Sequence, residues 1–130
     1  MELEFSRGEI ERCLSQAEDR LDAETVRLFR GYDYLHDAYI KSISWDYSQP
    51  VKVSCSIHLF QDVVPPACDL RIDMQDISAC HSSFCRQLSI NMEIYSLYLF
   101  RHPLGIELLC NTGGPLQFTI VAGQVRIRRA

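Results

Sequence analysis

The 130-residue chain lacks any run of about 18 apolar residues, so no membrane-spanning helix is expected. It also lacks an excess of basic residues, because 13 Lys and Arg stand against 17 Asp and Glu, a formal net charge of −4. This balance argues against non-specific binding to nucleic acid or to an anionic membrane, and it suits a basic protein partner. The first residues have neither the basic nor the apolar region of a secretory signal, which predicts a cytoplasmic location.

Linkers, internal repeats and low-complexity segments are lacking as well, so we expect a single domain over residues 1–130. Apolar residues make up 47% of the chain and charged residues 23%, which is ordinary for a globular protein with a buried core. The sequence pattern predicts a helical part over 6–30 and a β-rich part over 38–128. The predicted fold class is therefore α+β.

Cysteine, by contrast, is abundant for this length. The six cysteines are Cys13, Cys55, Cys68, Cys80, Cys85 and Cys110. An even number allows three disulfides, but the missing secretory signal favours reduced thiols. Cys55 and Cys110 fall at apolar positions of predicted strands, where a free cysteine behaves as a small hydrophobic residue.

The helical part is predicted over residues 8–29 from apolar residues at three- and four-residue spacing. Those apolar positions are Ile10, Cys13, Leu14, Ala17 and Leu21. Ser6 is a candidate N-cap, with Glu9 completing a capping box. Asp22 is a candidate N-cap for a second helix, and Gly31 a candidate stop. The pattern leaves one helix or two as open alternatives.

From residue 38 onward, apolar and polar residues alternate in short runs, as in half-buried strands. We expect six or seven strands, over residues 38–47, 51–60, 70–75, 88–94, 106–110, 116–121 and 125–128. The apolar run 95–100 either extends the fourth strand or crosses a corner. Residues 78–86 have no period, which predicts a connection.

Short strands joined mostly by tight turns predict an antiparallel sheet, sandwich or half-barrel, with the helical segment packed on it. The last strand, 125–128, carries Arg126 and Arg128. Such charges suit an exposed sheet edge, because they discourage pairing with other chains.

The stretch 32–46 joins the helical part to the sheet, and we assign it a structural role. Ile40, Ile43 and Trp45 reach one face of a strand if a bulge near Lys41 adds a residue. Asp37 would order the turn before that strand, and His36 would tie down a neighbouring loop. Adjacent residues in an extended segment point to opposite sides, so His36 and Asp37 are not expected to form a catalytic dyad.

The alternative is a small enzyme or metal-binding protein. It would use His36, Asp37 and His58, or the segment Cys80–Cys85, whose C-x₄-C spacing lies near that of zinc knuckles. Zinc ligands usually come in two close pairs, however, and Cys68 stands alone upstream. We therefore expect no catalytic residue, no metal and no cofactor.

Tyrosine and tryptophan are enriched at protein interfaces, and several lie at the junction of helix and sheet. The side chains expected to contact a protein partner are Tyr32, Asp33, Tyr34, Tyr39, Asp46, Tyr47 and Asp62.

The stretch Leu35-His36-Asp37-Ala38-Tyr39-Ile40-Lys41-Ser42-Ile43-Ser44-Trp45-Asp46 resembles the start of the first strand in a group of small, β-rich bacterial proteins. That group shares an hHD-x-x-I-x-x-I-x-x-D pattern. It includes uncharacterised domains and immunity proteins that neutralise toxins of polymorphic or contact-dependent systems. The layout of residues 94–127 fits the same group, whereas the cysteine-rich segment 78–86 has no counterpart in it.

The resemblance implies a non-enzymatic, cytoplasmic protein that blocks the active site of a cognate toxin, and it supplies no catalytic residues. A third alternative is a structural module that self-associates through a sheet edge, as a homodimer would.

Overall fold

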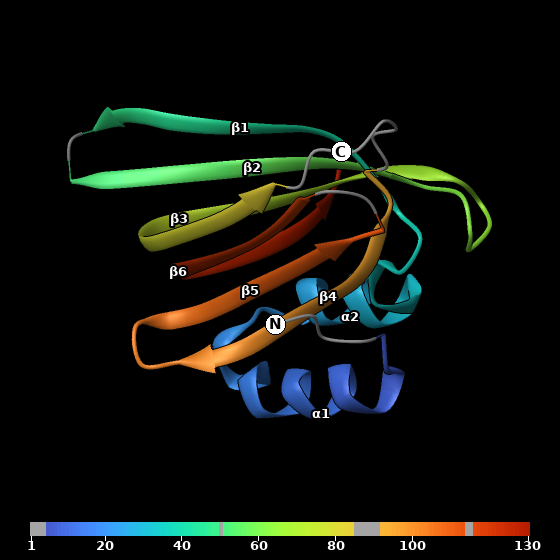
Figure 1. Cartoon of the computed structure of the whole chain (residues 1–130). Helices are drawn as coiled ribbons and strands as arrows, with labels where there is room; N and C mark the ends of the chain where they lie inside the picture. The colour runs from blue at the N-terminus through green and yellow to red at the C-terminus, as the bar shows by residue number, and fades with distance from the viewer. Residues whose placement is uncertain (1–4, 50, 85–91, 114–115) are drawn as a thin grey trace.

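The computed structural model describes residues 5–49, 51–84, 92–113 and 116–130. They form helices α1 (Arg7–Ala17) and α2 (Ala23–Gly31) and one antiparallel sheet of six strands, ordered β1-β2-β3-β6-β5-β4 (Figure 1). The strands are β1 (Tyr39–Gln49), β2 (Lys52–Gln61), β3 (Cys68–Phe84), β4 (Ile94–His102), β5 (Gly105–Thr112) and β6 (Leu116–Arg129). The predicted α+β class is confirmed, and the sheet is not closed into a barrel. Neither α1 nor α2 combines the length and the apolar character needed to cross a bilayer.

The helical part divides into two helices because each start has its own cap. The Ser6 hydroxyl accepts the Glu9 amide at 3.3 Å, and the Asp22 carboxylate accepts the Thr25 amide at 2.9 Å. A short 3₁₀ turn, Glu18–Arg20, separates them. The predicted apolar stripe of α1 is buried, and α1 packs against β4 while α2 packs against β6.

β3 and β6 are unusually long, with 17 and 14 residues, and both change direction midway. Figure 1 shows β3 turning through a tight curve at one end of the sheet. We call this point the sheet corner, formed by Asp76 and Gly123. Asp76 has a left-handed φ of 55°, and a Cβ on Gly123 would lie 3.0 Å from the Asp76 Cβ. Glycine at 123 therefore lets the two chains turn in close contact.

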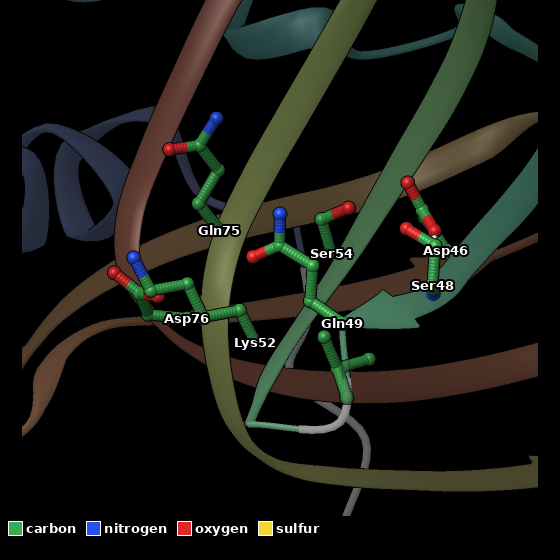
Figure 2. Close-up of a pocket in the computed structure, with 8 residues that line it drawn as sticks. Asp46, Ser48, Gln49, Lys52, Ser54, Gln75 and Asp76 are labelled. Carbon is green, nitrogen blue, oxygen red and sulfur yellow. Dashed lines mark hydrogen bonds between the residues drawn. The ribbon is translucent and has the colours of Figure 1, made fainter.

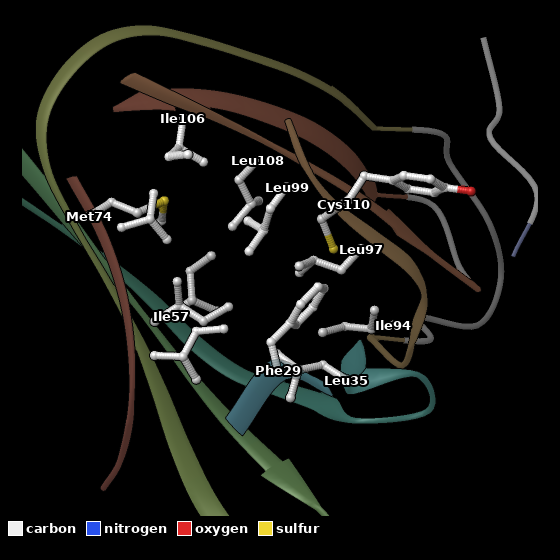
Figure 3. Close-up of a cluster of buried hydrophobic side chains, with 14 of the residues drawn as sticks. Phe29, Leu35, Ile57, Met74, Ile94, Leu97, Leu99, Ile106, Leu108 and Cys110 are labelled. Atoms are coloured by element: carbon white, nitrogen blue, oxygen red, sulfur yellow. The ribbon is translucent and has the colours of Figure 1, made fainter. Parts of the chain in front are cut away.

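The corner divides β3 into two parts with different partners. Residues 70–74 pair with both β2 and β6, whereas residues 77–84 pair with β6 alone among the described strands. Buried side chains from both parts of the sheet meet α2 in one core (Figure 3). Among them are Phe29, Ile57, Met74, Leu97 and Leu108.

The corner also explains two wrong strand boundaries. Residues 78–84, predicted as part of a connection, continue β3. The expected strands 116–121 and 125–128 are one strand, because β6 bends at Gly123 without ending. Elsewhere in the sheet, β4 begins at Ile94 and includes the run 95–100, so the alternative that this run belongs to the fourth strand is confirmed. The expected strand residues 88–91 lie outside the described part of the chain.

β6 lies inside the sheet, so the expectation that Arg126 and Arg128 mark an exposed edge was wrong. Within β6, only residues 117–122 pair with β5. α2 covers the rest of β6 on that side. The buried Thr25 hydroxyl accepts the Ile127 amide at 3.0 Å. Arg128 donates to Asp22 at 2.6 Å, and Arg126 lies 3.9 Å from the same carboxylate. The arginines therefore fasten the start of α2 to the sheet.

The predicted bulge in β1 is confirmed, since the register with β2 shifts between Ile40 and Ser42. Ile40 is buried, and Ile43 and Trp45 pack partly buried against the core, as expected. Next to this bulge, the Ile40 amide donates to the Met92 carbonyl at 2.9 Å. The start of β1 is thereby tied to the segment that leads into β4.

Candidate partner-binding surface

The far end of the β1–β2 hairpin projects beyond the rest of the sheet. We call residues 45–49 and 51–54 the hairpin tip. β2 pairs with β3 only as far as the Cys55–Met74 pair, after which β3 turns at the sheet corner. The tip residues of the two strands therefore pair only with each other in the described chain.

Aromatic and apolar side chains are exposed on this tip. The Trp45 and Tyr47 rings stack with centroids 6.3 Å apart and planes 18° apart. Tyr47 is 67% exposed and Val51 is 90% exposed. The alternating pattern predicted Val51 as an inward residue of its strand. That expectation was wrong because β2 begins one residue later, at Lys52, beyond the reach of the core.

Between the hairpin tip and the sheet corner lies a polar hollow of about 250 Å³ (Figure 2). Its lining residues are Asp46, Ser48, Gln49, Lys52, Val53, Ser54, Gln75 and Asp76. The Asp46 carboxylate accepts the Ser48 amide at 2.8 Å, and this bond lowers the pKa of Asp46. The hollow therefore presents an ionised carboxylate at neutral pH, with Asp76 on the opposite wall.

The first three predicted contact residues face other parts of the protein itself. Tyr32 is buried, and a hydrogen bond with Cys68 is the main cause that raises its pKa. Asp33 accepts two hydrogen bonds of 2.7 Å from Arg7, which lower its pKa. Tyr34 packs edge-on against Phe29, at 5.5 Å between ring centroids. These contacts assign the three residues to internal packing.

Tyr39 and Asp62 lie near the start of β1, with further carboxylates around them. Tyr39 is 43% exposed, and the charges of Glu93 and Asp62 are the main causes that raise its pKa. The pKa of Glu93 is raised too, first by its hydrogen bond with Asp37. Tyr39 and Tyr47 are eight residues apart, about 26 Å along a strand at about 3.3 Å per residue. The expected contact stretch is therefore two separate surfaces.

His36 and Asp37 approach each other more closely than the sequence suggested, with His36 Nε2 at 3.5 Å from Asp37 Oδ1. The prediction that they point to opposite sides was wrong because Asp37 has a left-handed φ of 65° instead of an extended one. The Asp37 amide donates to the Ile94 carbonyl at 2.9 Å. His36 Nδ1 lies 2.7 Å from the Tyr95 carbonyl, and its ring stacks on Phe5 at 3.7 Å. These contacts bind the junction to β4, in keeping with a structural role.

The residues of the enzyme alternative are not gathered at one place. His58 lies within β2 opposite Ser42 and Arg71, whereas His36 contacts Phe5 and Tyr95. Cys80 is exposed on β3, and Cys85 lies outside the described residues. No group of three or more His, Cys, Asp or Glu side chains within the described ranges is arranged to hold a metal ion.

The sequence signals only part of the candidate surface. Asp46 and Tyr47 were expected there, whereas Lys52, Gln75 and Asp76 were not. Gln75 and Asp76 reach the hollow only because β3 turns at the sheet corner, in the middle of what looks like an ordinary polar segment. A left-handed aspartate beside a glycine of another strand is a tertiary arrangement that no local pattern reports.

Comparison of the chain with protein-family models, with characterised proteins and with solved structures found no match. The functional assignment therefore depends on the geometry of this chain and on the resemblance carried by residues 35–46.

Proposed function

We propose that the protein is a non-enzymatic binding protein of the immunity type, which neutralises a cognate toxin by binding it through the hairpin tip. The observation that carries this proposal is Tyr47, an aromatic side chain that is 67% exposed and yet oriented by stacking on Trp45. Tyrosine and tryptophan supply large contact areas at small entropic cost, which makes them frequent anchors of protein interfaces.

The charge of the surroundings indicates a basic partner. Asp46 and Asp76 line the polar hollow, with Lys52 as its basic lining residue, at the hairpin tip that also carries Tyr47, and the whole chain has a net charge of −4. Acidic groups around an aromatic anchor speed association with a basic partner and discourage acidic ones. A basic toxin segment would place a lysine or arginine side chain in the hollow, with an apolar neighbour against Tyr47.

The proposal is tested by co-expressing the chain with the product of the adjacent gene and assaying rescue of growth and complex formation. We expect a complex that weakens as salt concentration rises, because part of the attraction is between charges. Failure of both rescue and complex formation would refute the proposal. A stoichiometric metal in the purified protein, lost in Cys85→Ser, would favour the enzyme or metal-binding alternative.

The surface itself is tested with Tyr47→Ala against a matched control, Leu104→Ala. Leu104 is 62% exposed in the β4–β5 turn, away from the tip. Loss of an aromatic anchor costs about 2 kcal/mol, which is about 30-fold in affinity. Equal affinities for the two variants would place the contact elsewhere on the protein.

A further inference from the structure

β1 is the first strand in the order of the sheet, so only one of its two sides is paired with a neighbouring strand, β2. Its first residues are covered on the other side as well, because the Ile40 amide donates to the Met92 carbonyl at 2.9 Å. Residues 42–46 have no neighbour on that side within the described chain, and we call them the open edge of β1. Backbone amides and carbonyls that point outward from such an edge can bond to an added strand.

The hydrogen bond of Ile40 shows which backbone groups point outward. Along an antiparallel ladder, residues alternate between bonding their opposite neighbour and pointing their amide and carbonyl away from it. The Ile40 amide reaches Met92, so Ile40 points away from β2, and the same holds opposite every second residue of β2. The bulge adds one residue to β1 without changing this alternation along β2. The outward pairs are therefore Ile40–Leu59, Ile43–Ile57 and Trp45–Cys55.

The opposite side of the sheet gives the same answer independently. The Ile127 amide donates to the Thr25 hydroxyl, so Ile127 points away from β3. Its partner Ile72 therefore points away from β6 and bonds to Ile57 of β2. Ile57 in turn points away from β1, which leaves the amide and carbonyl of Ile43 directed outward. Two hydrogen bonds at different places in the sheet thus agree on the backbone groups of the open edge.

We infer that the open edge receives an extended, basic segment of the toxin as an added strand. This inference rests on the proposed binding through the hairpin tip, because Trp45 and Asp46 belong to both the tip and the open edge. Main-chain hydrogen bonds to Ile43 and Trp45 would supply affinity, and the side chains beside them would supply specificity.

The charge at the open edge favours a basic segment. Asp46 is exposed and forms no ion pair with any described side chain. Lys41, just before the edge, donates to Asp69 at 3.1 Å, so its charge is compensated within the chain. Lys52 of the polar hollow lies on β2 opposite Gln49, away from the outer side of β1. The uncompensated charge on the open edge is therefore negative.

The two faces of the open edge differ, and this difference defines the sequence of the added strand. Ile43 and Trp45 lie on the face that is partly buried against the core, whereas Ser44 and Asp46 are exposed on the other face. Residues of an added strand lie about 5 Å from those they oppose. We therefore expect apolar side chains beside Trp45 to alternate with polar ones, and a lysine or arginine beside Asp46.

The geometry of the edge is tested on the free chain by amide hydrogen exchange followed by NMR. The amides of Ile43 and Trp45 should exchange at least about tenfold faster than that of Ser44, which bonds to β2. Equal protection of all three amides would overturn the inference. Protection of Ile43 and Trp45 that rises with protein concentration would overturn it too, because a second copy would then occupy the edge.

Strand addition is tested by repeating the measurement on the complex with the co-expressed product of the adjacent gene. The Ile43 and Trp45 amides should then exchange at least about tenfold more slowly than in the free chain. A complex in which both amides exchange as in the free chain would overturn the strand addition while leaving the proposed function standing. Absence of a complex would refute the proposed function and this inference with it.

The backbone contribution is separated from that of side chains with Ile43→Pro and its matched control, Ile43→Ala. Both variants lose the packing of Ile43, but only proline removes the outward amide, and it breaks no bond between β1 and β2. Ile43→Pro should bind the partner at least about tenfold more weakly than Ile43→Ala. Circular dichroism establishes that both variants are folded. Equal affinities of the two folded variants would overturn the inference.

The basic character of the segment is tested with Asp46→Lys against Asp62→Lys, which makes the same change of charge at an exposed residue beyond β2. Asp46→Lys should weaken the complex at least about tenfold more than the control, because like charges then oppose each other across the strands. Equal weakening by the two variants would overturn the placement of a basic residue beside Asp46.

Discussion

The two ends of β1 carry the same kinds of side chain in opposite surroundings. At its start, the backbone of Tyr39 forms an isolated β-bridge with Glu93. The Ile40 amide donates a hydrogen bond to the Met92 carbonyl, and the Ile40 side chain is buried. At its far end, Trp45 and Tyr47 extend beyond the last β2–β3 pair, and Tyr47 is largely exposed. We call these the packed end and the free end of β1. The same kinds of aromatic and acidic side chain lie against the protein's own chain at the end of β1 that another segment pairs with, and they are exposed to a partner at the end that no third segment of the described chain covers.

The packed end also holds backbone conformations that need support. Asp33, Tyr34 and Leu35 have φ values of 53°, 58° and 60°, followed by Asp37 at 65°. Left-handed conformations cost roughly 1–2 kcal/mol per non-glycine residue. The Arg7–Asp33 ion pair, the Tyr34–Phe29 contact and the burial of Leu35 offset that cost. The free end has no comparable positive φ among its described residues.

The largest expected effect comes from truncating a side chain at the packed end. Leu35 is fully buried, so Leu35→Ala should lower the free energy of unfolding by about 2–5 kcal/mol. Denaturant titration followed by fluorescence measures this change. A loss below about 1 kcal/mol would mean that the junction contributes little to the core.

A smaller effect is expected where α2 covers β6. Thr25→Val keeps the shape of the side chain but leaves the Ile127 amide without its acceptor, at a cost of about 1–3 kcal/mol. Thr25→Ser retains the hydroxyl and serves as the control. Hydrogen exchange at Ile127 should accelerate in the valine variant only, and equal exchange in both would contradict the assigned bond.

The carboxylates at the packed end predict a pH effect of definite sign. Because its hydrogen bond with Asp37 raises the pKa of Glu93 above the unfolded value, the folded state binds this proton more tightly. Stability from this group is therefore fully present below the unfolded pKa of about 4.3, and it is lost as pH rises through the folded pKa. Glu93→Gln should remove this loss and raise the melting temperature at neutral pH slightly. An unchanged pH profile would contradict the pairing.

The smallest effect is expected at the free end. Val51→Ala removes a side chain that is 90% exposed, so the free energy of unfolding should change by less than about 0.5 kcal/mol. Denaturant titration of Val51→Ala and Leu35→Ala under the same conditions compares directly how much each end of β1 contributes to the free energy of unfolding. A loss comparable to that of Leu35→Ala would show that the tip packs against something in solution.

Local patterns predicted what depends on neighbouring residues in the chain. Ser6 and Asp22 cap helices because their oxygens meet amides three residues ahead, and the bulge near Lys41 follows from the parity of Ile40 and Ile43. The strict alternation from Val53 to Leu59 likewise placed β2 to within one residue at each end.

The features that escaped prediction depend on contacts between distant segments. The bend of β3 requires Asp76 beside Gly123, and the interior position of β6 requires α2 to cover its unpaired side. The same bend forms the polar hollow and frees the hairpin tip. The candidate site was therefore predictable in Asp46 and Tyr47, but not in Lys52, Gln75 and Asp76.

The central claim is that the free end of β1 binds a partner and contributes little to stability. It is tested most directly by measuring both the stability and the affinity of one variant. Tyr47→Ala should leave the free energy of unfolding within about 0.5 kcal/mol of the parent chain while weakening the partner complex about 30-fold. Denaturant titration and titration with the co-expressed partner give the two numbers. A variant that loses stability by 2 kcal/mol or more, or that binds its partner unchanged, would contradict the division of β1 into a packed end and a free end.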